Sequence, residues 1–257
     1  MWKALKSRGL WGRKRKSEVS LKQLVGEGVS EPIAQTVLQT LPYTMTSSAR
    51  IAALCEAIEY VVARNIPGDI VECGVWRGGS MMAVAHTLRR LGSASRNLHL
   101  CDTFEGMTPP SQHDVSRDGA SAEVQLQQED RDDPRSVWCV AGLDEVKKNM
   151  ASTGYPSELL HYAVGPVEQT LPAAAPKKIA LLRLDTDWYE STKHEMEHLF
   201  PRLAVGGVLI IDDYGHWQGA RRAVDEYLEQ HRLPLLLHRI DYTGRMAVIP
   251  TASSRAA

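Results

Sequence analysis

Four aspartates follow two apolar runs of the chain, in a pattern suited to metal binding or proton transfer. A near-continuous apolar run is typical of a buried parallel strand, and open α/β sheets bind ligands at the carboxyl ends of their strands. If the two runs form neighbouring strands, the four carboxylates converge and raise one another's pKa values. A hard divalent cation such as Mg²⁺ would relieve the repulsion. The acids are Asp185 and Asp187 after the run 179–184, and Asp212 and Asp213 after the run 207–211.

Helix capping is the alternative explanation for these acids. Asp187 lies just before a predicted helix and would suit the N-terminal cap of that helix. Caps alone account poorly for four acids at two strand ends, so the pattern favours a functional site.

A glycine-rich loop connects a predicted strand that begins at Asp69 with a predicted helix that begins near Met81. Gly74, Gly78 and Gly79 permit a tight turn that brings the backbone close to a ligand at the helix N-terminus. The spacing differs from GxGxxG, and an acid precedes the first glycine, which argues against the dinucleotide fingerprint. A plain turn between strand and helix remains the alternative.

Asp102 ends the next predicted strand, which begins at Asn97. An acid at the end of the second strand is where the ribose hydroxyls of a cofactor are usually held. A helix cap is again the alternative. Together, the glycine-rich loop and Asp102 favour a cofactor site.

Length and composition bound the class of protein. The chain has 257 residues, 43% of them hydrophobic, and a net charge of −1, which fits one large folded domain and gives no sign of nucleic acid as a partner. No run of about 18 apolar residues and no apolar N-terminal signal is present, so we expect a cytoplasmic protein without a membrane span. The cysteines form no CxxC pair and are expected to be reduced, buried thiols. They are Cys55, Cys73, Cys101 and Cys139.

Three segments are expected along the chain: a basic tail with a helical extension over 1–40, a main domain over 41–250, and a tail over 251–257. Residues 1–16 carry only basic charges and are expected to be solvated, a membrane- or nucleic-acid-binding arm being the alternative. The acid-rich stretch 111–136 has little apolar periodicity. It predicts an insertion near 105–137, either a lid over the site or a surface loop.

The order of the predicted elements indicates the fold class. Strands that alternate with helices predict an α/β protein with a Rossmann-like, doubly wound parallel sheet. Near the C-terminus, the stretches 235–240 and 246–249 are typical of an antiparallel closing hairpin.

With these motifs in view, the chain resembles the macrocin O-methyltransferase family, class I S-adenosylmethionine-dependent enzymes that methylate sugar hydroxyls on antibiotics. The resemblance extends from about Tyr43 to Pro250 and depends on several linked motifs in the right order. The motifs are YTM (43–45), PGDIVECGVWRGGS (67–80), DTFEG (102–106), LDTDWYEST (184–192) and IDDYGHWQGA (211–220).

The resemblance implies a seven-stranded sheet with a reversed last hairpin, S-adenosylmethionine and Mg²⁺ as cofactors, a small-molecule glycoside as acceptor, and a homo-oligomer. It implies that Asp187 is the catalytic base and that Asp185, Asp212 and Asp213 bind Mg²⁺. His216, on a nearby loop, is a second candidate for the base, although a lone histidine there is more often a surface or capping residue. The residues expected at the cofactor are Thr44, Met45, Glu72, Gly74, Val75, Ser80, Asp102, Thr103 and Asp185.

The expected reaction passes a methyl group in line to a sugar hydroxyl. A neutral alcohol is a poor nucleophile, so the metal would lower its pKa and the base would accept its proton. Two alternatives stay open: a phenol or catechol as the acceptor, and a cofactor-binding subunit that has lost catalysis. Aromatic residues beside the acids would either dock a sugar ring or pack at the edge of the sheet. They are Trp188, Tyr189, Tyr214 and Trp217.

Overall fold

The computed structural model describes residues 19–133 and 136–250, so the basic stretch 1–16 and the tail 251–257 lie outside the described residues. A seven-stranded sheet has the order β3-β2-β1-β4-β5-β7-β6. β7 is antiparallel to both of its neighbours, and the other pairs are parallel. The predicted fold class is confirmed. The strands are β1 (Asp69–Cys73), β2 (Leu98–Asp102), β3 (Leu160–Val164), β4 (Ile179–Leu184), β5 (Leu203–Ile211), β6 (His238–Arg239) and β7 (Arg245–Val248).

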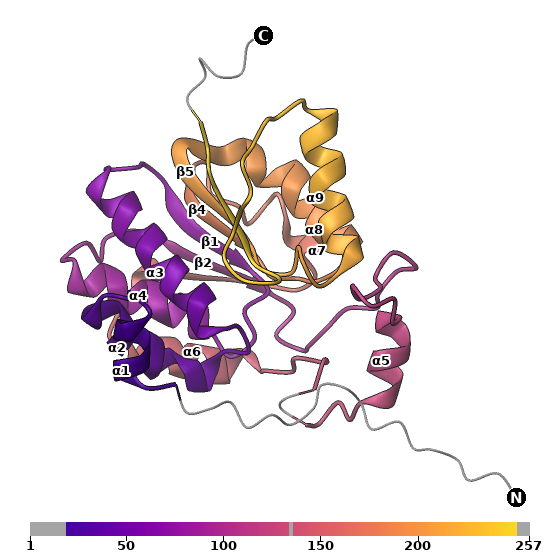
Figure 1. The fold of residues 1–257 in the computed structure, drawn as a ribbon, viewed down its shortest axis with the longest axis horizontal. Helices are drawn as coiled ribbons and strands as arrows, with labels where there is room; N and C mark the ends of the chain where they lie inside the picture. Colours follow the sequence, from indigo (N-terminus) through magenta and orange to yellow (C-terminus); the bar gives the residue numbers. More distant parts are fainter. Residues whose placement is uncertain (1–18, 134–135, 251–257) are drawn as a thin grey trace, which may run out of the picture.

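Helices cover both faces of the sheet (Figure 1). On one face lie α3 (Ser48–Ala63), α4 (Gly79–Arg90) and α6 (Leu143–Ser152), with α1 (Leu21–Gly26) and α2 (Glu31–Thr40) outside them. On the other lie α7 (Val167–Thr170), α8 (Tyr189–His198) and α9 (Gln218–Gln230). Side chains of β4 divide between the two cores: Ala180 and Leu181 join the first, and Ile179, Leu182 and Leu184 join the second. Burial on both faces explains why this strand reads as a continuous apolar run.

The strand order reverses between β1 and β4. From β1 the sheet continues through β2 to β3, and from β4 it continues in the opposite direction through β5. The carboxyl ends of strands at such a switch point form the usual ligand crevice of open α/β sheets.

The stretch predicted as an insertion contains α5 (Ala122–Gln128) and lies at one side of the sheet (Figure 1). Ala122 and Leu126 pack with Trp188 and Trp217, which follow β4 and β5. Ser116 also forms an isolated β-bridge with Trp217. The stretch is therefore packed against the loops at the carboxyl edge, and its role as a lid stays a prediction. Three short helices, η1 (Leu41–Tyr43), η2 (Ser157–Leu159) and η3 (Phe200–Arg202), complete the fold.

The bounds of α8 and β6 differ from the sequence prediction for identifiable reasons. α8 begins at Tyr189, not at Thr192, because the carboxylate of Asp114, distant in sequence, accepts a hydrogen bond from the Tyr189 backbone N–H. β6 covers only His238–Arg239 of the predicted strand 235–240. It is an edge strand that pairs only with β7, and Leu236 before it is 84% exposed, so little burial supports a longer strand.

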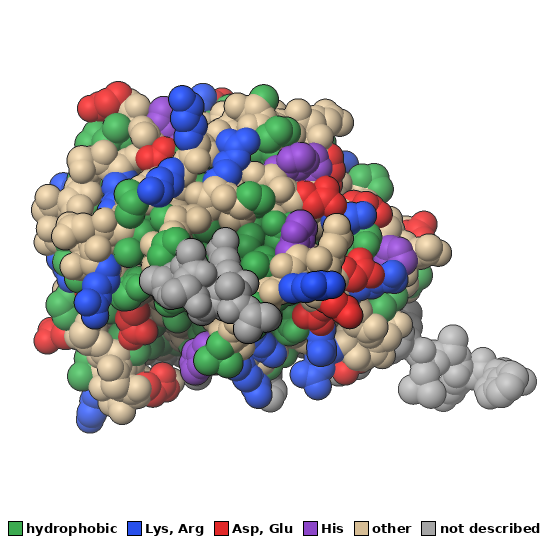
Figure 2. Space-filling model, turned by 90° about the horizontal axis from the view of Figure 1, so that it is seen from above, with side chains coloured by type: hydrophobic (Ala, Val, Ile, Leu, Met, Phe, Trp, Pro, Cys, Tyr) green, Lys and Arg blue, Asp and Glu red, His purple; other side chains and the backbone are tan. Residues whose placement is uncertain are grey.

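The mixture of surface charges and the free state of the cysteines agree with what the composition predicted. Basic and acidic side chains are interspersed on the face that Figure 2 shows. All four cysteines are free, and three of them are buried. Among the described helices, none combines the length and apolarity needed to cross a membrane.

Gly74 permits the close approach of the loops that follow β1 and β4. Its φ is +82°, and a Cβ at this position would lie 2.1 Å from the carbonyl oxygen of Asp185. The backbone N–H of Asp185 donates to the carbonyl of Cys73 at 2.8 Å. A side chain at Gly74 would therefore separate the two loops that carry the predicted site.

We predict that Gly74→Ala destabilises the protein by about 3 kcal/mol or more, because both the backbone conformation and the contact with Asp185 are violated. Gly92→Ala is the matched control, since Gly92 is also left-handed (φ +64°) but has no atom within 4 Å of the added Cβ. It should cost about 1 kcal/mol. Urea denaturation measures the loss in the free energy of unfolding for both variants. Equal losses would mean that the crowding at Gly74 is relieved without an energetic cost.

Candidate active site

The acids that follow β4 and β5 meet at the carboxyl edge of the sheet. The two strands are hydrogen-bonded neighbours, with Leu184 opposite Ile211, as the sequence predicted. Oxygen atoms of Asp185, Asp187 and Asp213 lie within 4.8 Å of one another. These three residues are called the acid cluster below.

Arg183 lies beneath the acid cluster on the otherwise apolar β4, with 4% of its side chain exposed. Its Nη1 donates to Glu72 Oε1 at 2.8 Å and to Asp185 Oδ2 at 2.6 Å. Its Nη2 donates to Asp212 Oδ1. Burial disfavours the charge of Arg183, but Asp185 and Glu72 outweigh it and raise the pKa of the guanidinium. One buried cation therefore orients carboxylates from three adjacent strands.

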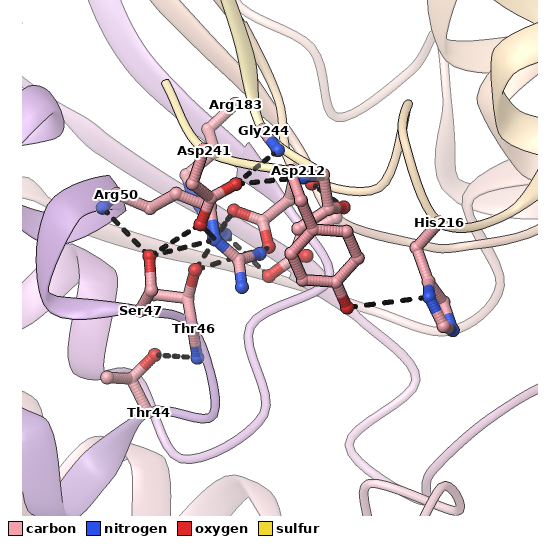
Figure 3. Close-up of polar contacts among 12 residues, drawn as sticks. Thr44, Thr46, Ser47, Arg50, Arg183, Asp212, His216, Asp241 and Gly244 are labelled. Carbon is pink, nitrogen blue, oxygen red and sulfur yellow. Dashed lines mark hydrogen bonds and ion pairs between the residues drawn. The ribbon is translucent and has the colours of Figure 1, made fainter. Parts of the chain in front are cut away.

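Asp212 is not one of the three acids of the cluster, and it lies beside Arg50, Arg183 and Thr46 instead (Figure 3). Its Oδ1 accepts from Arg183 and its Oδ2 from Arg50, and Thr46 Oγ1 lies 3.3 Å from both oxygens. The sequence placed Asp212 with Asp185 and Asp213 and left Asp187 to face the substrate. In this structure Asp187 instead of Asp212 completes the cluster. The division of these acids between metal ligands and base stays a prediction.

The acid cluster is short of positive charge. Burial raises the pKa of Asp187 well above its usual value, and the carboxylate of Asp213 raises it further. Burial also raises the pKa of Asp185, against the opposing effect of Arg183. Beneath them, burial raises the pKa of Glu72 to about 7 although Arg183 is bound to it.

A pocket opens over the switch point between β1 and β4. Glu72, expected to line it, is 1% exposed and lies behind the lining, where it binds Arg183. The other residues expected at the cofactor all line the pocket: Thr44, Met45, Gly74, Val75, Ser80, Asp102, Thr103 and Asp185.

Asp102 fixes the glycine-rich loop. Its Oδ2 accepts from the backbone N–H of Val75 at 2.5 Å and of Trp76 at 3.2 Å. Its Oδ1 accepts from the backbone N–H of Phe104 at 2.7 Å. Asp102 therefore connects the loop after β1 with the loop after β2, and its predicted contact with a ribose would add to these bonds.

Asp114 anchors the insertion to the site. It is 1% exposed, and its Oδ1 accepts from the backbone N–H of Tyr189 at 2.7 Å. Its Oδ2 accepts from the N–H and hydroxyl of Ser111 at 2.6 and 2.9 Å. Nearby, Trp188 Nε1 donates to the carbonyl of Thr108 at 2.9 Å. The insertion thus binds the first turn of α8, immediately after Asp187.

His216 and two of the four predicted aromatic residues line the pocket. Trp188 and Trp217 meet edge to face with ring centroids 5.0 Å apart. Tyr189 and Tyr214 instead direct their hydroxyls to acids on α9, at 2.7 and 2.6 Å. Burial lowers the pKa of His216, so its imidazole is neutral near pH 7 and able to accept a proton.

Sequence reasoning missed the two arginines and the backbone of Asp187. Arg183 had a signal, because it is the one charged residue within the apolar run 179–184. Arg50 had none, since it lies in the first turn of α3, far from the acids in sequence. Asp187 has a φ of +68°, a conformation that costs energy in non-glycine residues and often occurs at functional sites.

The macrocin-O-methyltransferase (TylF) family model matches residues 28–247. The chain belongs to this family. The 8-demethyl-8-(2,3-dimethoxy-alpha-L-rhamnosyl)-tetracenomycin-C 4'-O-methyltransferase of Streptomyces olivaceus is 33% identical over 217 residues, 84% of this chain and 79% of that protein. Mycinamicin III 3''-O-methyltransferase of Micromonospora griseorubida is 32% identical over 205 residues, 80% of this chain and 78% of that protein.

The solved structure of the O-methyltransferase NovP superposes with a TM-score of 0.70 at 31% identity, covering 81% of this chain and 83% of that one. The resemblance inferred from the motifs and the enzyme class, an O-methyltransferase, are confirmed. The family match includes the glycine-rich loop, both acid motifs and the insertion.

In this member of the macrocin-O-methyltransferase family, we predict that Asp114→Ala releases the insertion from α8. The helix would lose its cap, at a cost of about 1–2 kcal/mol, and the stretch 111–133 would become sensitive to limited proteolysis. Asp118→Ala is the control, because the side chain of Asp118 is 83% exposed. Equal cleavage of both variants would show that Asp114 does not anchor the insertion.

Proposed function

We propose that this protein transfers a methyl group from S-adenosylmethionine to a sugar hydroxyl of a glycosylated natural product, with the help of Mg²⁺. The observation that carries the proposal is the acid cluster, Asp185, Asp187 and Asp213, at a pocket that the glycine-rich loop and Asp102 also line. Two relatives support the acceptor class: one is named for a rhamnosyl tetracenomycin and another for mycinamicin III. We also expect a cytoplasmic homo-oligomer.

The acid cluster fits a divalent cation. Its carboxylates repel one another, and Oδ2 of Asp213 is buried without a hydrogen bond from any described residue. Oxygen ligands of this kind suit Mg²⁺. Asp185 and Asp213 are common to the set expected from the sequence and the set that the geometry favours.

The pocket fits the proposed methyl donor. The start of α4, with Ser80, would accept the carboxylate of the methionine part, because backbone N–H groups at a helix N-terminus favour an anion. Asp102 would hold the ribose, since a carboxylate offers about four acceptor sites and backbone N–H groups occupy three of them. The Thr103 hydroxyl lies 3.3 Å from Asp102 but donates over a shorter distance, 2.7 Å, to the carbonyl of Gly106. Thr44 and Met45 would close over the cofactor from the segment before α3.

The described residues suggest how the acceptor is activated. Mg²⁺ would supply the charge that lowers the pKa of a bound hydroxyl. Asp187, raised in pKa by burial and by Asp213, would accept the proton of that hydroxyl, and His216 is the second candidate. Trp188 and Trp217 would exclude water and orient the sugar ring beside the acids.

We predict that the purified protein binds S-adenosylhomocysteine in calorimetry and methylates a glycosylated polyketide or macrolide but not the matching aglycone. EDTA should stop turnover, and Mg²⁺ should restore it. Methylation of the aglycone alone, followed by mass spectrometry, would favour a phenol or catechol acceptor. Binding of S-adenosylhomocysteine with no transfer to any acceptor would favour a subunit that has lost catalysis.

The roles of Asp187 and Asp212 can be separated by comparing two quantities in Asp187→Asn and Asp212→Asn: kcat, and the Mg²⁺ concentration for half-activation. If Asp187 is the base, its variant should lose about 10²–10⁴-fold in kcat while the Mg²⁺ concentration for half-activation stays constant. If Asp187 is instead a ligand, as the geometry of the acid cluster favours, that concentration should rise for Asp187→Asn. Direct titration with Mn²⁺, followed by electron paramagnetic resonance, measures metal binding without turnover, with Asp213→Asn as the positive control for a lost ligand.

A further inference from the structure

Four segments of the chain meet at Arg50 (Figure 3), which binds Asp212, the residue directly before Asp213 of the acid cluster. They are the segment before α3, the first turn of α3, the end of β5, and the turn between β6 and β7. The residues that join them are Ser47, Arg50, Asp212 and Asp241, called the Arg50 bridge below.

Arg50 contacts two carboxylates with different nitrogens. Its Nη1 binds Asp212 Oδ2, and its Nε lies 3.1 Å from Asp241 Oδ2. Its side chain is 12% exposed, and that of Asp212 is 4% exposed. Removing Arg50 would leave Asp212 paired with Arg183 but Asp241 without an arginine partner among the described residues, so both contacts help to hold this geometry.

The bridge holds the segment that covers the cofactor side of the pocket. Ser47 Oγ donates to Asp241 Oδ2 at 2.7 Å and accepts from the backbone N–H of Arg50 at 3.2 Å. Thr46 Oγ1 reaches Asp212, and Thr44 Oγ1 accepts from the backbone N–H of Thr46 at 3.2 Å. The polar side chains from Thr44 to Ser47 are thus tied, directly or through one another, to Asp212 and Asp241.

The bridge also holds the turn between β6 and β7. Asp241 Oδ1 accepts from the backbone N–H groups of Thr243 and Gly244 at 3.0 and 2.8 Å. Thr243 Oγ1 donates to the carbonyl of Asp212 at 2.6 Å. A Cβ at Gly244 would lie 2.8 Å from Arg50 Cδ, so this glycine leaves the space that the arginine fills. The turn and the Arg50 side chain therefore pack closely against each other.

We propose that Arg50 is a positioning residue that couples closure of the 44–47 segment over the cofactor to the placement of the acids after β5. Asp212 precedes Asp213 of the acid cluster, so a bridge that fixes Asp212 also fixes the backbone of its neighbour. The inference rests on the proposed function for the identity of the cofactor. Arg50, Thr46 and Asp212 line the pocket. Asp241 does not line it and acts through Arg50 and Ser47.

The contacts require an arginine. Nε and Nη1 point to two separate carboxylates, whereas a lysine offers one compact ammonium at the end of a flexible chain. Arg50→Lys keeps the charge beside the acid cluster but cannot reproduce both contacts. It therefore separates the effect of the charge from the effect of the bridge.

The test measures binding of S-adenosylhomocysteine by calorimetry, without metal or acceptor. We expect Arg50→Met, Arg50→Lys and Asp241→Asn each to weaken binding about tenfold, in the usual range for coupling between sites. The double variant Arg50→Met/Asp241→Asn should be no weaker than the worse single variant, because both remove one bridge. Hydrogen exchange of residues 43–47 should be faster in each variant.

Glu59→Gln is the matched control, because it removes an exposed ion pair with Arg90 from the same helix, α3. It should bind S-adenosylhomocysteine as the parent does. If Arg50→Met fails to fold, Asp241→Asn and Ser47→Ala carry the test. Parental affinity in Asp241→Asn and Ser47→Ala, or additive losses in the double variant, would overturn the inference. A parent protein that binds no S-adenosylhomocysteine would instead overturn the proposed function and the cofactor coupling together.

Discussion

The buried guanidinium of Arg183 is the interaction on which the arrangement of the site depends. A charge between two apolar cores is stable only if it is paired and hydrogen-bonded. Its partners come from three adjacent strands: Glu72 from β1, Asp185 from the end of β4, and Asp212 from the end of β5. Because the strand register fixes where these carboxylates stand, the sheet determines the positions of the acids at its edge. These buried ion pairs of Arg183 are therefore better understood as a source of structural specificity than of folding stability.

Arg183 balances only part of the charge that it gathers. Asp187 and Asp213 form no ion pair with it within 4.0 Å, and burial keeps the pKa of Asp187 high. The same rim contains backbone in unfavourable conformations, with positive φ at Trp76, Cys139 and Asp187, all of which line the pocket. Such strain persists only where the surrounding packing enforces it. The protein thus holds like charges and strained backbone together at one place, a combination common at functional sites.

The sequence predicted the strands and the convergence of the acids well, because both follow from local pattern. The apolar run 179–184, ended by two acids, is enough to indicate a central strand and a functional edge. Contacts between side chains that are distant in sequence could not be predicted from the sequence. Asp212 was assigned to the metal because it adjoins Asp213, but two arginines and Thr46 surround its carboxylate. The start of α8 was misplaced for the same reason, since its cap comes from Asp114.

The acids at the edge of the sheet and the insertion are held in place by different contacts. The acids are placed by sheet register and by Arg183, which any change in the central strands would disturb. The insertion is held by Asp114 at the first turn of α8, by the packing of α5 on Trp188 and Trp217, and by backbone hydrogen bonds between residues 115–117 and 216–218. No residue of the insertion takes part in the pairing of β4 with β5. A change within the insertion is therefore physically separable from a change in the positions of the acids at the edge of the sheet.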